Sequence, residues 1–275
     1  MSFSVNTNVG AMVALQYLSL SAASLQHTEN AVSTGLKVAT AKDDGSTFAI
    51  AQNMRADVAG YSAVTDSLNR GMSSVNVALS AGQSISDLMM ELKQKALAAS
   101  DASIDTASRQ ALNEDFTALR DQIATIVNNA VFNNFNLVNG STTMLTALAS
   151  ADGTRHDTVA AANMSLSGQI VTITTTGTIS TQAKASAMIA VVQKSLENVN
   201  SALARLSAGE KKFSIQGDFV SKLSDSLTVG IGNLVDANMA QESAKLQSLQ
   251  VKQQLGVQAL SIANQAPQVT LSLFH

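Results

Sequence analysis

Apolar residues at both ends of the chain recur at the spacing of one helix face. Between residues 11 and 36 they return at steps of 3, 4 and 7, and Glu29 is the only charged residue in that stretch, with histidine counted as neutral. A second apolar set follows another side of the same predicted helix: Val9, Val13, Tyr17 and Leu20. The N-terminal segment is therefore predicted to be a helix with two apolar faces.

The last helical segment also carries two apolar stripes, about 140° apart on a helix that turns roughly 100° per residue. One stripe runs from Leu246 to Ala263 and the other from Val251 to Ile262. A helix with two apolar faces needs neighbours on two sides, and exposed apolar patches mark protein contacts. We therefore predict that both ends are assembly surfaces, with these contact residues: Leu15, Leu18, Leu25, Val32, Leu249, Leu255, Leu260 and Ile262.

The interior of the chain predicts long helices. Apolar residues from Met54 to Ala99 keep steps of 4 and 3 with one phase shift, which predicts a helix of about fifty residues. A second helix is predicted over 112–126, antiparallel to the first because residues 100–106 form a short break. A third begins near Gln182 and packs along the first. The single proline, Pro267, leaves these helices without the residue that most often breaks them.

The residue composition changes between about residues 140 and 180, from helix-forming patterns to turn dipeptides and β-branched residues. Asn139-Gly140 and Asp152-Gly153 are turn dipeptides, and Ile170–Thr176 has high β-propensity and is predicted to be a strand. Gly230-Ile231-Gly232 is predicted to interrupt the chain before the last helix. The predicted fold class is mainly α, a long antiparallel helical rod or coiled-coil bundle with a small β-hairpin region at the tip.

Composition narrows the classes of partner. Charged residues are 13% of the chain, against roughly 25% in soluble proteins, and the net charge is −3, so we expect no nucleic-acid partner. Cysteine is absent, which removes disulfides and thiolate sites. The first residues lack a secretory signal pattern, and we expect no window to approach the roughly 18 to 20 apolar residues of a membrane span, so membrane insertion is not expected.

The sequence offers little catalytic chemistry. The three histidines have no ligand spacing, and Asp43-Asp44 precede a predicted helix, where carboxylates cap the first turn. We therefore expect no metal, no cofactor and no enzyme activity. The Ser/Thr cluster over 141–181 has two interpretations, strand-forming threonines with solvated turns or an acceptor region for O-linked sugars. The candidate acceptors are Thr142, Thr143, Thr172, Thr174, Thr176 and Ser180.

Two segments resemble the terminal signatures of bacterial flagellin. Near the start these are Val5–Asn8, Ala14-Leu15 and Ser33–Asp44, continued by Ala49-Ile50-Ala51, and near the end Leu255–Gln268 and Leu271–Phe274. The resemblance implies an inner-tube domain (1–34 and 236–275) and an outer-tube domain (35–235) with a β region at about 140–180. It implies a small flagellin without further outer domains, which polymerises with itself into a swimming filament.

The same resemblance implies further partners and a location. The subunit would leave the cell through the flagellar type III export apparatus with an export chaperone, and would meet hook-associated and cap proteins outside the cell. Flagellins sensed by the animal innate receptor carry arginines where Leu88 and Met90 stand, so weak or no sensing is implied here. No role is assigned to His275.

Two alternatives fit parts of the pattern. A hook-associated junction protein shares terminal helices of this kind but forms a short ring. A chemoreceptor-like helical hairpin is also rich in Ala, Ser and Gln, but it predicts continuous heptads without a β region, and the threonine-rich stretch around Ile173 argues against it.

Overall fold

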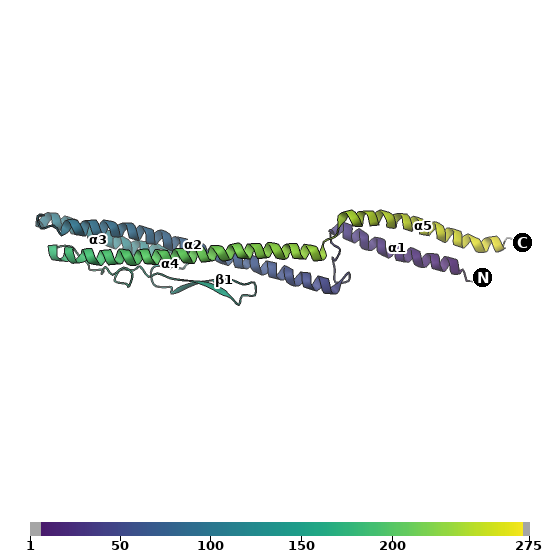
Figure 1. Cartoon of the computed structure of the whole chain (residues 1–275), viewed down its shortest axis with the longest axis horizontal. Coiled ribbons are helices and arrows are strands. Elements are labelled where there is room, and N and C mark those ends of the chain that lie inside the picture. The colour runs from purple at the N-terminus through teal and green to yellow at the C-terminus, as the bar shows by residue number, and fades with distance from the viewer. Residues whose placement is uncertain (1–6, 272–275) are drawn as a thin grey trace. The chain divides into compact units, whose positions relative to one another are not determined.

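The structure, a computed structural model, describes the backbone of residues 7–271 and the side chains of residues 7–265. Within this range the chain forms five helices and one pair of strands (Figure 1). In chain order these are α1 (Val9–Thr34), α2 (Gly45–Ala99), α3 (Thr106–Asn129), β1 (Met144–Leu148), β2 (His156–Ala160), α4 (Gln182–Val235) and α5 (Met239–Leu271). The mainly helical class with a small hairpin is confirmed. Residues 5, 6 and 272–274 of the signatures, and His275, lie outside the described residues.

Helix ends follow the capping chemistry in the sequence. The side chain of Asn8 accepts a hydrogen bond from the backbone N–H of Ala11 at 3.0 Å and starts α1. Gly35 ends α1 with φ of 73°, a conformation that glycine adopts without steric cost. Asp105 caps α3 by accepting from the N–H of Ser108 at 2.6 Å, as the break over 100–106 predicted.

The described chain divides into two compact units. Unit 1 comprises Met1–Ala56 and Ser226–His275, and unit 2 comprises Asp57–Asp225. In unit 2, α3 and α4 each run antiparallel to α2, because residue numbers rise along α2 as they fall along the partner helix. Lys95 and Ala99 of α2 bond to Asp115 and Arg109 of α3, and Ser86 and Lys93 of α2 bond to Asn200 and Gln193 of α4. Its core contains large side chains with no more than 1% exposure, among them Leu68, Ile85, Met89, Leu92, Phe116, Ile123, Leu206 and Phe213.

The hairpin packs on the helices of unit 2. Leu145 of β1 lies opposite Val159 of β2 in an antiparallel pair, and the connecting turn contains Gly153 with φ of 70°, as Asp152-Gly153 predicted. The N–H of Leu148 donates to the hydroxyl of Ser67 on α2 at 3.0 Å, and Gln216 on α4 donates to the carbonyl of Ala149 at 3.2 Å. The hairpin therefore lies along the sides of α2 and α4. The sequence had predicted it at the tip of the helical rod, so that position is corrected.

The predicted strand over 170–176 is wrong. Val171 and Ile173 are buried while Thr172 and Thr174 are exposed, so the alternation itself is present. No strand pairs with this segment, since β1 and β2 form the one sheet among residues 7–271. Instead, the N–H of Thr172 donates to the hydroxyl of Ser195 on α4 at 3.0 Å. The pattern marks extended backbone that packs on a helix.

The predicted interruption at Gly230-Ile231-Gly232 is also wrong, because α4 continues to Val235. A glycine costs a helix about 1 kcal/mol relative to alanine, which neighbouring contacts can offset. Here Ile231 packs against a small buried cluster in unit 1 formed by Val38, Ala51 and Val235.

Candidate subunit interface

Helices α1 and α5 of unit 1 lie side by side and antiparallel (Figure 1). We call their shared contact surface the seam. Leu18 Cδ1 lies 3.2 Å from the position that a Cβ of Gly256 would occupy, so this glycine leaves room for the leucine. At the N-terminal end of α1, the side-chain amide of Asn8 donates to the carbonyl of Ala263 of α5 at 2.7 Å. The least exposed residues recur at steps of 3 and 4, as in a coiled coil: 11, 14, 18, 21, 25, 28 and 31 in α1, and 246, 249, 253, 256, 260 and 263 in α5.

The eight predicted contact residues divide between this seam and the surface. Leu249 is buried, and four others are half-buried on the α1 and α5 surfaces: Leu18, Leu25, Val32 and Leu260. Leu15, Leu255 and Ile262 are 56%, 58% and 69% exposed. The structure brings the first group together within one chain and leaves the second group without cover from the described residues.

Two small residues of the seam were not among the predicted contact residues. Thr28 and Ala31 are buried at 0% and 3% exposure, although neither was a candidate. The hydroxyl of Thr28 has no hydrogen-bond partner among the described residues. Thr28 lies three residues after Leu25, and Ala31 lies three residues after Thr28, so the helical spacing was the available signal, but their small size hid it.

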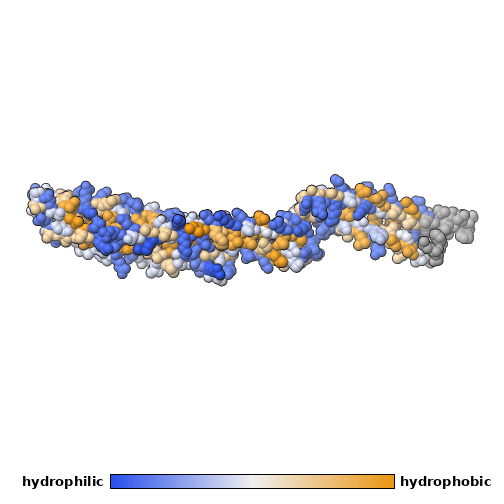
Figure 2. Space-filling view, in the orientation of Figure 1, coloured by the Kyte–Doolittle hydropathy of each residue, from blue (hydrophilic) through white to orange (hydrophobic). Residues whose placement is uncertain are grey.

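Large apolar side chains remain exposed on the outer faces of both helices (Figure 2). We call the α1 outer band the residues Val9, Val13, Tyr17 and Leu20, and the α5 outer band the residues Val251, Leu255 and Ile262; all are between 44% and 69% exposed. Met12, at 64% exposure, and Val257, at 54%, add to this surface and were not among the candidates. The two-faced character predicted for both helices is thus present.

Carboxylates stabilise the turn between α1 and α2. Asp44 accepts from the N–H groups of Ser46 and Thr47 at 3.0 and 3.1 Å, and hydrogen bonds from the Thr47 and Ser46 hydroxyls hold the pKa of its carboxyl well below its usual value. Asp43 accepts from the N–H of Thr40 at 2.8 Å, which lowers its pKa in the same direction. The predicted capping role is confirmed for Asp44, whereas Asp43 bonds to Ala39 and Thr40, which precede α2.

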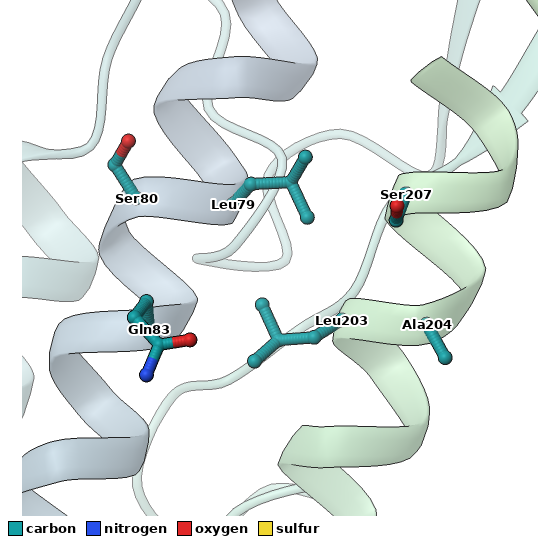
Figure 3. A pocket seen from close by; sticks show the side chains of 6 residues that line it. All are labelled: Leu79, Ser80, Gln83, Leu203, Ala204 and Ser207. Carbon is teal, nitrogen blue, oxygen red and sulfur yellow. The ribbon is translucent and has the colours of Figure 1, made fainter. Parts of the chain in front are cut away.

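Unit 2 has an open groove between α2 and α4 of about 690 Å³ (Figure 3). Leu79 and Leu203 point toward one another across it, and Ser80, Gln83 and Ser207 line its sides. No titratable side chain is among the described residues that line this groove. Its chemistry suits packing against another surface and offers no group for proton transfer or metal binding.

The candidate sugar acceptors differ in accessibility. Thr143, Thr174 and Thr176 are exposed, whereas Thr142 and Ser180 are half-buried. The hydroxyl of Thr172 already bonds to that of Ser195 at 2.9 Å. The structure thus favours Thr143, Thr174 and Thr176 as sites that a transferase could reach, and modification itself stays a prediction.

Comparison with known protein families matches both ends of the chain. The bacterial flagellin N-terminal helical region matches residues 5–143, and the bacterial flagellin C-terminal helical region matches residues 189–274. The chain belongs to the bacterial flagellin family. The stretch between the two matches, residues 144–188, holds the β-hairpin and the extended segment that packs on α4.

Individual relatives agree with this assignment. This flagellin is 51% identical to flagellin FljK of Caulobacter vibrioides over 272 residues, 99% of this chain and 98% of that protein. It is 36% identical to a flagellin of Brucella melitensis over 281 residues, 99% of each chain. The crystal structure of Bacillus cereus flagellin shares the fold at 17% identity and a TM-score of 0.50, over 56% of this chain and 88% of that one. The chain is a small flagellin without the additional outer domains.

Helix α1 is also apolar enough to resemble a membrane span, which was not predicted from the sequence. By length and composition α1 of this flagellin is one helix that could cross a membrane, so the expectation that no window reaches that composition is wrong. The criterion is met near the N-terminus by an 18-residue window of mean hydropathy 1.2. In this flagellin one face of that helix packs on α5, so part of its apolar surface already has a protein partner.

Proposed function

We propose that this chain is the structural subunit of a flagellar filament used for swimming, and that its terminal helices carry the contacts between copies. The main support is that α1 and α5 pack on each other and still leave their apolar outer bands exposed. Burying one leucine or valine contributes roughly 1.5 to 3 kcal/mol, so repeated burial along a polymer makes a strong lattice. A heterologous contact that does not close produces a helical filament.

The domain assignment follows from this role. Residues 1–34 and 236–275 form the inner-tube domain, and residues 35–235 form the outer-tube domain with the β region at about 140–180. Support comes from the seam between α1 and α5 and from the extensive core around Phe116 and Phe213 in the helical bundle. The inner-tube helices order fully when copies assemble, because a two-helix pair buries little apolar surface by itself.

The partners follow from the family. The subunit is exported through the flagellar type III apparatus with an export chaperone, assembles outside the cell, and contacts hook-associated proteins at one end of the filament and the cap at the other. It forms a homopolymer, binds no nucleic acid and performs no enzymatic reaction. The absence of cysteine is compatible with threading an unfolded chain, since no disulfide can obstruct it.

The surface of unit 2 bears on recognition by the host. Met90 on α2 is 52% exposed. The resemblance to flagellins that the receptor senses implies that they carry an arginine at this position. A methionine offers no charged bidentate contact, so the innate receptor senses this subunit weakly or not at all. A reporter-cell assay tests this, and potency equal to that of an arginine-bearing flagellin would refute it.

Electron microscopy of the purified protein after seeding tests the filament role. Long uniform tubes on the order of 100 to 200 Å across, several helix diameters, are the expected result. Short rings of fixed length would instead assign the chain to the hook-associated junction class. Monomers that never polymerise, even on filament seeds, would contradict both assignments.

A further inference from the structure

A cavity of about 940 Å³ opens at the turn end of the β-hairpin in unit 2. Asp57 and Tyr61 line it from α2, one helical turn apart, and Phe219 lines it from α4. The hairpin turn bounds it on a third side and packs directly on α2, because a Cβ on Gly60 would lie 2.7 Å from that of Ala151. Three elements therefore form a hollow of the size that small-molecule sites have.

Two aromatic rings in this cavity remain accessible. Phe219 is 57% exposed, and Tyr61 is half-buried. The face of an aromatic ring attracts a cation through the quadrupole of the ring, and rings of this kind recognise quaternary ammonium groups. An apolar molecule would gain contact with the same rings but would leave the charged groups of the cavity without partners. The rings and charges together therefore favour a ligand with an ammonium group.

One of the three aspartates that line the cavity is free to meet such a group. Asp157 forms an ion pair with Lys212 of α4 at 2.8 Å, and Asp152 accepts a hydrogen bond from the N–H of Thr154 at 3.1 Å. Asp57 is exposed, and its carboxylate forms no ion pair or hydrogen bond with the residues that the structure describes. The negative charge available to a ligand is therefore that of Asp57.

Arg155 provides a positive charge on the other side of the cavity lining. Its backbone is held in the hairpin, where its N–H donates to the hydroxyl of Ser150 at 3.0 Å and its carbonyl accepts from Ala149 at 2.9 Å. Its guanidinium is exposed and, among residues 7–265, pairs with no carboxylate, that of Asp57 included. A free guanidinium binds a planar carboxylate through two parallel hydrogen bonds.

We propose that this cavity binds a zwitterion with a quaternary ammonium group and a carboxylate joined by a short chain, the chemical class of the betaines. The ammonium group lies against the rings of Phe219 and Tyr61 beside Asp57, and the carboxylate accepts hydrogen bonds from Arg155. A cation or an anion alone gains only one of these two contacts. Because Asp57 and Arg155 are too far apart to pair, the ligand needs a chain between its charges. This site does not depend on the filament role.

The tyrosine content of the chain gives a direct test. Its two tyrosines are Tyr17 in α1 and Tyr61 in the cavity, so ring-labelled tyrosine provides one reporter and one internal control for NMR. Titration of the full-length monomer with γ-butyrobetaine should shift the Tyr61 signal saturably, with half-saturation on the order of 1 to 10 mM, and leave Tyr17 unchanged. Choline and acetate, at matched ionic strength, should each require at least tenfold higher concentration. No saturable shift at Tyr61, or an equal response to choline, would overturn the proposal.

Variants separate the two charged contacts. Asp57→Asn and Arg155→Gln should each weaken γ-butyrobetaine binding at least fivefold, and Arg155→Gln should also bind γ-butyrobetaine and choline equally, because it lacks the group that distinguishes them. Phe219→Leu keeps an apolar side chain and should weaken binding at least threefold. Asp66→Asn and Arg205→Gln are matched controls, since both residues are exposed on the same two helices and neither lines the cavity.

Equal weakening by the control variants would assign the effect to net charge and overturn the site. Circular dichroism of each variant verifies that the helices are intact. Filament formation by the wild type reports on the proposed function separately, so filaments without γ-butyrobetaine binding would contradict this inference alone.

Discussion

The two units of this flagellin differ in how much of their apolar surface the chain itself buries. In unit 2, large side chains such as Leu68, Phe116 and Phe213 are fully buried by the chain's own helices. Among the described side chains of α1 and α5 in unit 1, those of Thr28, Ala31 and Leu249 are buried, while large residues such as Tyr17 and Ile262 remain exposed. One unit therefore completes its core within the chain, whereas the other leaves large apolar side chains exposed, which the filament role proposed above would cover with further copies.

The seam between α1 and α5 shows why this pair is incomplete. Small residues occupy much of it, so Leu18 meets Gly256 and little apolar area is lost from water at that level. A polar hydroxyl, that of Thr28, is buried there without a partner among the described residues. We infer that assembly supplies the stabilisation that the seam lacks.

The largest expected effect is loss of assembly from a charge in the seam. Leu18→Asp or Leu260→Asp should abolish filaments, because the carboxylate would be placed between α1 and α5, while the unfolding of unit 2 stays unchanged. Sedimentation and electron microscopy measure the first result, and denaturant unfolding the second. Leu18→Met is the matched control and should still polymerise, since it conserves volume and polarity. Normal filaments from either Asp variant would mean that the seam is not needed for assembly.

The next effect separates a core residue from an exposed one. Phe116→Ala should lower the free energy of unfolding of the monomer by about 3 to 5 kcal/mol, because it leaves a cavity in the core of unit 2. Tyr17→Ala should change it by about 0.5 kcal/mol or less, because that ring is 67% exposed. Urea denaturation followed by circular dichroism measures both. Equal losses would show that the α1 outer band is already covered in the monomer.

The features of the fold that depend on local periodicity and on helix capping were predicted from the sequence. The helices, the two-faced ends, the Asn139-Gly140 and Asp152-Gly153 turns and the caps at Asp44 and Asp105 follow from local spacing and from hydrogen bonds within a few residues. Three features depend on contacts between distant residues and were missed: the position of the hairpin against Ser67 and Gln216, the extended packing of 170–176 on Ser195, and the continuity of α4 through Gly230.

The candidate interface was predictable to a similar extent. Large apolar residues gave the faces of α1 and α5, but the spacing alone could not decide which face meets the other helix and which stays exposed. That choice depends on small residues such as Gly256, which admits Leu18, and Ala31, which is buried with no large side chain. Small residues carry a weak signal in a hydrophobicity pattern even when they determine the packing.

A smaller effect concerns the buried hydroxyl. Thr28→Val keeps the shape of the side chain and removes a group without a partner, so it should stabilise the α1–α5 pair by about 1 kcal/mol. Hydrogen exchange of the α1 amides in the full-length monomer should then slow by about fivefold. Thr34→Val is a control at an exposed position, where the hydroxyl bonds to the carbonyl of Asn30 at 2.8 Å, and it should not slow exchange. Faster exchange in Thr28→Val would mean that this hydroxyl does find a partner.

The smallest effect tests whether the units also differ in their turns. Hydrogen bonds from the Ser150 hydroxyl and from Thr154 lower the pKa of Asp152 to about 2. A carboxyl whose pKa is lower folded than unfolded stabilises the fold above the unfolded value, near 3.8, and this contribution is lost as the pH falls toward 2. The urea midpoint of Asp152→Ala should therefore lie slightly below that of the wild type at pH 7, and the gap should close between about pH 4 and 2.

Asp44 in unit 1 provides the matched comparison, because its pKa is lowered by the same kind of hydrogen bonds. Exchange of the first amides of α2 in Asp44→Ala, relative to the wild type, should show a gap at pH 7 that closes in the same direction as the pH falls. Matching behaviour would assign the difference between the units to their cores, since turns of the same chemistry would then stabilise both. A gap that stayed constant with pH in one unit would show that its turn does not depend on the ionised carboxylate.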